Sequence, residues 1–204
     1  MAENWKQAGL VLMRSAGQES NINLPNVLTL VRILLIPVFV MLLIDPTPDR
    51  ALAAAIVFVV AAVTDLLDGY VARKTGQITK LGRLLDPIAD KLLVLSALIL
   101  LVQVDRVSAL VAILLIAREV AVTGLRAIAA SEGLIMSAEV PGKYKMALQV
   151  IAIVLLVLEG TVVEAIGNLH LAGIVTLYLS LILGYVSGAQ YVWSFWRQVG
   201  AKGL

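Results

Sequence analysis

The feature that most constrains the fold of this chain is a series of six apolar segments separated by short polar breaks. They occupy residues 26–44, 51–73, 86–104, 107–130, 143–158 and 168–196. A helix that spans a membrane needs about 20 predominantly apolar residues, and most of the segments are close to that length. We therefore predict an all-α integral membrane protein, built as a bundle of six transmembrane helices.

Composition supports a membrane protein and excludes several other classes. Of 204 residues, 60% are hydrophobic and only 15% are charged, whereas a soluble domain has about 25% charged residues. The net charge is +2 and no run of basic residues occurs, so we expect no nucleic-acid partner. The chain has no cysteine, which excludes disulfides, thiolate catalysis and cysteine metal sites.

The lysines and arginines orient the predicted bundle, because such residues favour the cytoplasmic side of a membrane. Breaks on one side, together with the termini, hold Lys6, Arg14, Lys74, Lys80, Arg83, Lys143, Lys145, Arg197 and Lys202. The other side holds only Arg50 and Arg106, each beside an aspartate. We predict a multi-pass protein of the cell (inner) membrane with both termini in the cytoplasm. On the outer side, we expect Glu159 and Glu164 to be solvated and His170 to be interfacial.

The organisation of the chain is expected to be simple. Residues 1–22 would form an N-terminal segment containing a short amphipathic helix on the membrane surface. A disordered tail is the alternative for this segment. Residues 23–204 would form one six-span domain, with no room for a second one.

Four aspartates recur in the pattern Asp65-x2-Asp68-Gly69-x2-Ala72-Arg73-x8-Gly82-x3-Asp86-x3-Asp90. Helical spacing places the first two on one helix face and the last two on one face of the next helix. A carboxylate beside hydrocarbon is costly without a partner, and four together would repel one another unless cations balanced them. Oxygen donors suit hard cations. We predict two divalent cations, Mg²⁺ or Mn²⁺, which would clamp a diphosphate.

The other residues of the pattern favour chemistry over simple cation binding. Gly69, Ala72 and Gly82 remove side-chain bulk where a ligand or a backbone comes close. Arg73 can bind phosphate oxygens through two N–H groups. We therefore predict phosphoryl or phosphatidyl transfer at the cytoplasmic face. The alternative is that the aspartates only cap a span in water and the glycines only pack helices.

The complete pattern resembles the signature of the CDP-alcohol phosphatidyltransferase family. The resemblance implies a six-span, homodimeric enzyme in which an alcohol displaces CMP from a CDP-linked lipid, with two divalent cations. It implies that Asp65, Asp68 and Asp86 are metal ligands, and that Asp90 is the general base as well as a ligand. The CDP moiety would be bound by Asp68, Gly69, Ala72, Arg73 and Gly82.

Three further segments, 23–32, 117–126 and 142–145, resemble the branch of that family that uses sn-glycerol 3-phosphate as the acceptor. This resemblance implies CDP-diacylglycerol and sn-glycerol 3-phosphate as substrates. Asn26, Thr29 and Arg32, in the first of these segments, would support the site.

Four cations favour the same acceptor on physical grounds. Arg118 and Arg126 lie two turns apart on one helix face, inside an apolar segment where a cation needs an anionic partner, and Glu119 could pair with only one of them. With Lys143 and Lys145 they would form a pocket for an acceptor that carries its own phosphate. The alternative is a buried structural pair, Arg118–Glu119, with lysines that only orient the segment.

Two other functions stay open at this point. The first is the same chemistry with inositol phosphate or phosphatidylglycerol as the acceptor. The second is a divalent-cation transporter, although transporters often carry inverted repeats and the aspartate pattern occurs here once.

Overall fold

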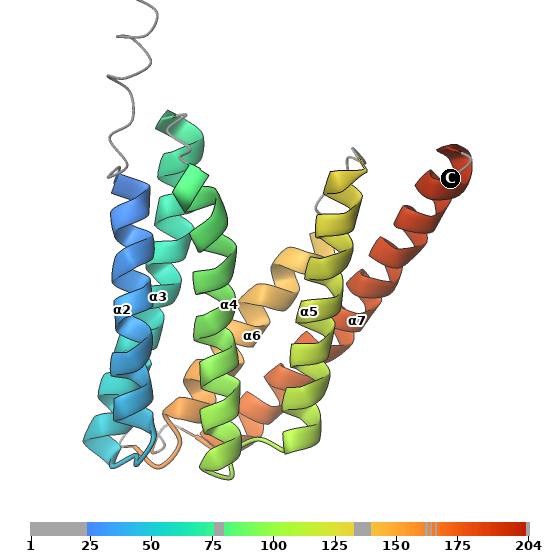
Figure 1. Ribbon diagram of the computed structural model, residues 1–204. Helices are drawn as coiled ribbons and strands as arrows, with labels where there is room; N and C mark the ends of the chain where they lie inside the picture. The colour runs from blue at the N-terminus through green and yellow to red at the C-terminus, as the bar shows by residue number, and fades with distance from the viewer. Residues whose placement is uncertain are drawn as a thin grey trace, which may run out of the picture.

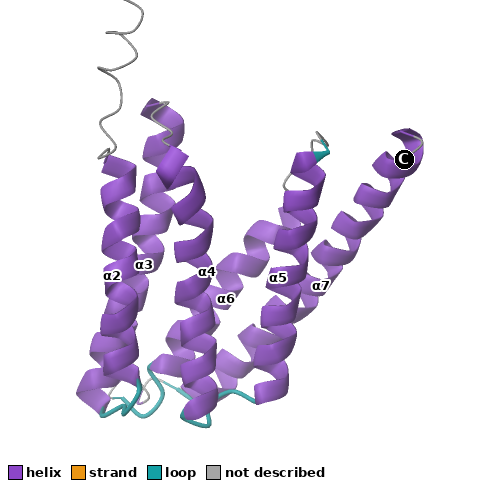
Figure 2. Cartoon of the chain, in the orientation of Figure 1, coloured by secondary structure: helices purple, strands orange, loops and turns teal. Residues whose placement is uncertain are grey.

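The computed structural model of the chain is all-helical over the residues that it describes (Figure 2). The described backbone comprises residues 24–75, 80–132, 140–161, 163, 165 and 167–202. The described side chains comprise residues 27–65, 88–89, 91–132, 144–161, 163, 165 and 167–199. Within these ranges there are six helices and no strand. The predicted all-α class is confirmed, whereas the N-terminal amphipathic helix falls outside the described residues.

The helices follow the six predicted segments. They are α2 (Leu24–Leu43), α3 (Pro48–Thr75), α4 (Lys80–Gln103), α5 (Ala109–Ser131), α6 (Val140–Val157) and α7 (Leu169–Lys202). Successive helices run in opposite directions (Figure 1). The first residues of α2, α4 and α6 therefore lie at the same end as the last residues of α3, α5 and α7. We call this the upper end, as in Figure 1, and the other the lower end.

Three helices, α3, α4 and α7, extend further than the apolar composition predicted. The connection expected over residues 74–81 is shorter, because α3 continues to Thr75 and α4 already begins at Lys80. At the other end of the chain, α7 continues past Trp196 to Lys202. Backbone hydrogen bonding along a helix does not require apolar side chains. A helix can thus extend into a polar stretch, where composition gives no signal.

The start of α3 shows how local sequence fixes a helix end. Thr47 precedes the helix, and its Oγ1 accepts a hydrogen bond from the backbone N–H of Arg50 at 3.4 Å. A threonine at this position satisfies one of the four N–H groups that have no partner within the helix. Pro48 follows as the first helical residue, where its missing N–H costs nothing and its fixed φ suits the helix.

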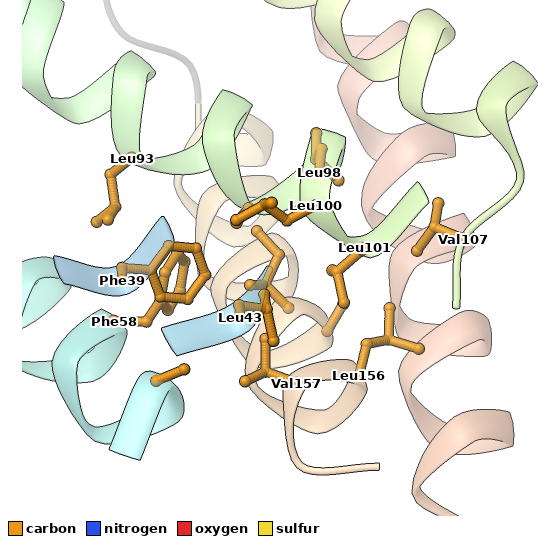
Figure 3. Close-up of a cluster of buried hydrophobic side chains, with 14 of the residues drawn as sticks. Phe39, Leu43, Phe58, Leu93, Leu98, Leu100, Leu101, Val107, Leu156 and Val157 are labelled. Atoms are coloured by element: carbon orange, nitrogen blue, oxygen red, sulfur yellow. The ribbon is translucent and has the colours of Figure 1, made fainter. Parts of the chain in front are cut away.

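An apolar core joins all six helices in their lower halves, and Figure 3 shows part of it. Its fully buried members include Phe39, Leu43, Phe58, Leu98, Leu101, Leu115, Leu156 and Leu177. The rings of Phe39 in α2 and Phe58 in α3 pack with their centroids 5.5 Å apart and their planes tilted by 45°. Most of the buried polar side chains lie elsewhere. Thr29, Arg32, Lys145, Gln149 and Ser187 belong to the upper halves of their helices or to the middle of the bundle.

The outer surface of the helices is apolar. Within the described residues, one helix is long and apolar enough to cross a membrane, over Leu169–Val199, and shorter apolar stretches occur at Val27–Leu43, Lys91–Gln103 and Tyr144–Val157. Large apolar side chains on every helix point outward, among them Leu34, Leu110 and Trp193 with 68%, 64% and 70% exposure. Extensive exposed apolar surface marks contact with lipid or another protein. These features support membrane association.

Candidate functional site

The aspartate pattern falls on the upper halves of α3 and α4. Asp65 and Asp68 are one turn apart in α3, and Asp86 and Asp90 are one turn apart in α4. The two helices run antiparallel and pack against each other, so both pairs lie toward the upper end (Figure 1). The side chains of Asp68, Asp86 and Asp90, and those at positions 69, 72, 73 and 82, lie outside the described residues. Their convergence stays a prediction.

Asp65 is the member of the pattern whose side chain is described, and it forms an ion pair with α2. The distance from Arg32 Nη1 to Asp65 Oδ1 is 2.6 Å, with the arginine side chain 0% exposed and the aspartate side chain 22% exposed. Thr29 lies one turn before Arg32 and is also buried. A buried cation requires a well-placed anion. α2 therefore contributes a fixed positive charge to the aspartate pattern, while the side chain of Asn26 lies outside the described residues.

The chemistry of the aspartate pattern fits hard divalent cations. Carboxylate oxygens are the donors that Mg²⁺ and Mn²⁺ prefer, and helix positions three or four residues apart project from the same face. Among the side chains that the structure describes, no group of three His, Cys, Asp or Glu residues could hold a metal ion. Three of the four aspartates are not among those side chains.

A second charged cluster joins α5, α6 and α7. Arg118 Nη1 lies 3.1 Å from Glu119 Oε1, and Lys145 Nζ pairs with the same oxygen. The side chains of Arg118 and Lys145 are 10% and 7% exposed. Two cations therefore share one carboxylate, which leaves the three side chains with a net formal charge of +1. The buried Arg118–Glu119 pair expected as the alternative is present, and Lys145 extends it.

α7 contributes polar contacts that sequence reasoning missed. Arg118 Nε donates to the carbonyl of Gly184 at 2.8 Å, and Arg118 Nη2 donates to Ser187 Oγ at 2.6 Å. Ser180 Oγ donates to the carbonyl of Lys145 at 3.2 Å. The last apolar segment carried no predicted site residue. The sequence feature that could have indicated these contacts is the spacing of Ser180, Gly184 and Ser187, which places three small or polar residues on one helix face.

Arg126 and Lys143 do not complete the predicted four-cation pocket within the described residues. The guanidinium carbon of Arg126 lies 5.3 Å from the centre of the Tyr191 ring, a cation–π contact two turns along α5 from Arg118. The side chain of Lys143 lies outside the described residues. The structure thus brings Arg118 and Lys145 together through Glu119 and places Arg126 in a separate contact with α7.

At the lower end, one expectation is wrong. Glu159 is not simply solvated, because its Oε2 lies 3.6 Å from Arg106 Nε and 3.0 Å from His170 Nδ1, and its side chain is 26% exposed. Arg106 Nη1 also donates to the carbonyls of Leu156 and Val157, both at 3.0 Å. The last carbonyls of a helix lack partners within it. Arg106 supplies those partners, and its charge then holds Glu159.

The other two outer residues complete this picture. His170 has a side chain 46% exposed, and its interfacial position stays a prediction. Glu164 lies outside the described residues.

The similarity to known proteins includes both the aspartate pattern and the Arg118–Glu119–Lys145 cluster. The sequence profile described as CDP-alcohol phosphatidyltransferase matches residues 22–186. Three bacterial relatives share the name CDP-diacylglycerol–glycerol-3-phosphate 3-phosphatidyltransferase. The Bacillus subtilis (strain 168) relative is 41% identical over 187 residues, covering 86% of this chain and 96% of its own. The relative from Rickettsia bellii (strain RML369-C) is 38% identical over 169 residues, covering 83% and 93%. That from Wigglesworthia glossinidia brevipalpis is 34% identical over 182 residues, covering 87% and 97%.

Proposed function

The chain belongs to the CDP-alcohol phosphatidyltransferase family, and on that premise we propose its reaction. It transfers a phosphatidyl group from CDP-diacylglycerol to sn-glycerol 3-phosphate, giving phosphatidylglycerol phosphate and CMP. The protein is thus a transferase of phospholipid biosynthesis. The observation that carries this proposal is the arrangement of the bundle, with the apolar core in the lower half, the aspartate pattern in the upper halves of α3 and α4, and the Arg118 cluster near the middle.

The residues of α3 and α4 take the catalytic roles. Asp65, Asp68, Asp86 and Asp90 would hold two divalent cations, Mg²⁺ or Mn²⁺. Bound there, such cations would neutralise phosphate charge and stabilise the attacking and leaving oxygens. Asp90 is the general base that takes the proton of the acceptor 1-hydroxyl. That oxygen forms the new P–O bond to the phosphatidyl phosphorus, and the bond to CMP breaks.

The remaining residues of the pattern bind the donor. Asp68, Gly69, Ala72, Arg73 and Gly82 form the CDP site. Arg32 holds the carboxylate of Asp65 in a fixed orientation, which the 2.6 Å ion pair supports.

The acceptor phosphate binds to the basic residues of α5 and α6. We assign this role to Arg118, Arg126, Lys143 and Lys145. The support is the net positive charge of the Arg118–Glu119–Lys145 cluster, which is almost buried and would gain from an anionic ligand. Inositol phosphate is the other acceptor that carries a phosphate monoester for such a pocket.

We place the enzyme in the cell (inner) membrane as a six-span bundle, with the upper end and both termini in the cytoplasm. The alternating directions of the helices support an even number of crossings (Figure 1). The exposed apolar side chains on every helix support contact with lipid. A homodimer, as the family resemblance implies, would cover part of that surface. Residues 1–22 form a separate N-terminal segment in this arrangement.

A transfer assay tests the proposal directly. Purified protein in detergent is mixed with CDP-diacylglycerol and radiolabelled sn-glycerol 3-phosphate, with Mg²⁺, with Mn²⁺ or with EDTA. We expect label in the lipid phase and an equal amount of CMP, only when a cation is present. Inositol phosphate and phosphatidylglycerol serve as competing acceptors. Preferred use of either would contradict the acceptor assignment, and a lack of CMP release with every acceptor would favour the transporter alternative.

A further inference from the structure

We infer that α7 holds Arg118 in the orientation that receives the acceptor phosphate, with Ser187 as the positioning residue. The inference rests on the proposed function, because it concerns the acceptor site of that reaction. It assigns a role to a helix in which sequence analysis found no site residue.

The hydrogen bonds of Arg118 fix its guanidinium group in three directions. Nε donates to the carbonyl of Gly184, Nη1 to Glu119 Oε1 and Nη2 to Ser187 Oγ. The last of these, at 2.6 Å, is the shortest. Ser187 Oγ in turn donates to the carbonyl of Gly184 at 3.2 Å. The serine hydroxyl is therefore itself oriented, and it sets the rotation of the guanidinium plane.

Two N–H groups of Arg118 are left over. A guanidinium has five N–H donors, and the three contacts above use one each on Nε, Nη1 and Nη2. Nη1 and Nη2 each retain one N–H that has no hydrogen-bond partner among the described residues. A pair of N–H groups on the two terminal nitrogens is the arrangement that binds a phosphate in bidentate fashion. A lysine at this position would offer a point charge instead.

The backbone of α7 at Gly184 must lie close to Arg118 for its carbonyl to accept the hydrogen bond from Nε. A Cβ atom at position 184 would lie 3.4 Å from Arg118 Nε and 3.5 Å from Lys145 Cγ. A methyl group would just fit, and it would already contact both Arg118 and Lys145. Gly184 thus allows the approach, while Ser187, which is 7% exposed, supplies the orienting hydroxyl.

Four variants test the inference by two measurements. Ser187→Ala removes the hydroxyl, Arg118→Lys replaces the guanidinium and its paired N–H groups by an ammonium group, and the double variant combines the two changes. Ser194→Ala is the matched control, since it makes the same change on the same helix and the Ser194 hydroxyl makes no hydrogen bond within the described residues. The first measurement is equilibrium binding of radiolabelled sn-glycerol 3-phosphate. The second is the KM and kcat for each substrate.

We expect Ser187→Ala to weaken glycerol 3-phosphate binding and raise its KM by roughly three- to tenfold, the effect of losing one hydrogen bond of ordinary strength. The kcat and the KM for CDP-diacylglycerol should stay within about twofold, as for a change in ground-state binding. Arg118→Lys should weaken binding at least as much. In the Arg118→Lys background, Ser187→Ala should have no further effect, because the serine acts through the arginine.

Ser187→Thr and Ser187→Val keep the inference testable if the alanine variant fails to fold. These two side chains have nearly the same shape and differ in the hydroxyl. Threonine should bind glycerol 3-phosphate more tightly than valine, by roughly three- to tenfold.

The outcomes separate the inference from the proposed function. If the wild type and Arg118→Lys behave as expected but Ser187→Ala matches Ser194→Ala, only the role of Ser187 is overturned. Equal effects of Ser187→Ala in both backgrounds overturn it too, since the serine would then act independently of Arg118. If the wild type neither binds nor uses sn-glycerol 3-phosphate, the proposed function fails, and the inference fails with it.

Discussion

Arg32 is a charged side chain with no exposed surface, and its ion pair with Asp65 ties α2 to the aspartate pattern on α3. Arg118 and Lys145 share Glu119 in the same manner. Breaking a buried pair costs more than the pair itself contributes, because the remaining charge loses its partner. The single residues with the largest expected effects are therefore the partners of buried charges as well as the catalytic aspartates.

Replacing Arg32 by methionine tests the buried pair at the residue scale. We expect a loss of about 3 kcal/mol in unfolding free energy, at the lower end of the range for broken buried pairs, because Asp65 retains some exposure. The measurement is unfolding in mixed detergent micelles with EDTA present. Arg50→Met is the control, since the Arg50–Asp45 pair is exposed and should contribute about 0–1 kcal/mol. Equal losses in the two variants would contradict a special role for Arg32.

Asp90→Asn tests the general base. We expect kcat to fall by about 10²–10⁴-fold, the usual contribution of a positioned base, while CDP-diacylglycerol binding persists. Asp45→Asn provides the comparison, because Asp45 lies in an exposed connection with a side chain 84% exposed. Turnover of the Asp90→Asn variant near the wild-type rate would remove Asp90 from the mechanism.

At the scale of elements, α6 and α7 pack through a glycine. A Cβ atom at position 173 would lie 2.7 Å from Leu156 Cγ and 3.3 Å from the backbone nitrogen of Leu156. Leu156 is fully buried in the core, so it has little freedom to move aside. The close approach of these two helices therefore depends on the missing side chain.

Gly173→Ala should destabilise the fold by about 1–3 kcal/mol, the typical cost of overpacking a core. Gly124→Ala is a matched change in α5, where a Cβ atom would meet nothing within 4 Å. There, the better helix propensity of alanine should stabilise by about 0.5–1 kcal/mol. Thermal unfolding of both variants in one detergent measures the difference, and effects of the same sign would contradict the packing argument.

How far the sequence predicts these elements differs from one to the next. The length of the apolar segments predicted every described helix, because a span requires a fixed length of apolar chain. The partners of the buried cations were harder to predict, since the pairing of Lys145 with Glu119 depends on how α5 and α6 pack. The contacts of Ser187 depend on the same tertiary packing. Glu159 was misjudged because the need of the α6 end for donors is invisible before the helix end is placed.

For the whole molecule, the concentration of lysines and arginines toward the upper end predicts that this end faces the cytoplasm. Because the chain lacks cysteine, single cysteines can report topology without background. Ser131→Cys and Ser108→Cys place nearly isosteric probes at exposed positions at the two ends of α5. A membrane-impermeant maleimide should label Cys at 108 in intact cells and Cys at 131 only after the membrane is opened. The reverse pattern would invert the proposed orientation.

The ion pair between α2 and α3 also affects the order in which the protein can be made. An aspartate that is already paired with an arginine can enter the membrane as part of an ion pair with no net charge. The first two helices therefore carry their own charge balance at this position as they emerge from the ribosome and enter the bilayer. Zinc fingers, by contrast, stay unfolded until their metal arrives. For Asp65, membrane insertion need not wait for the cellular metal supply.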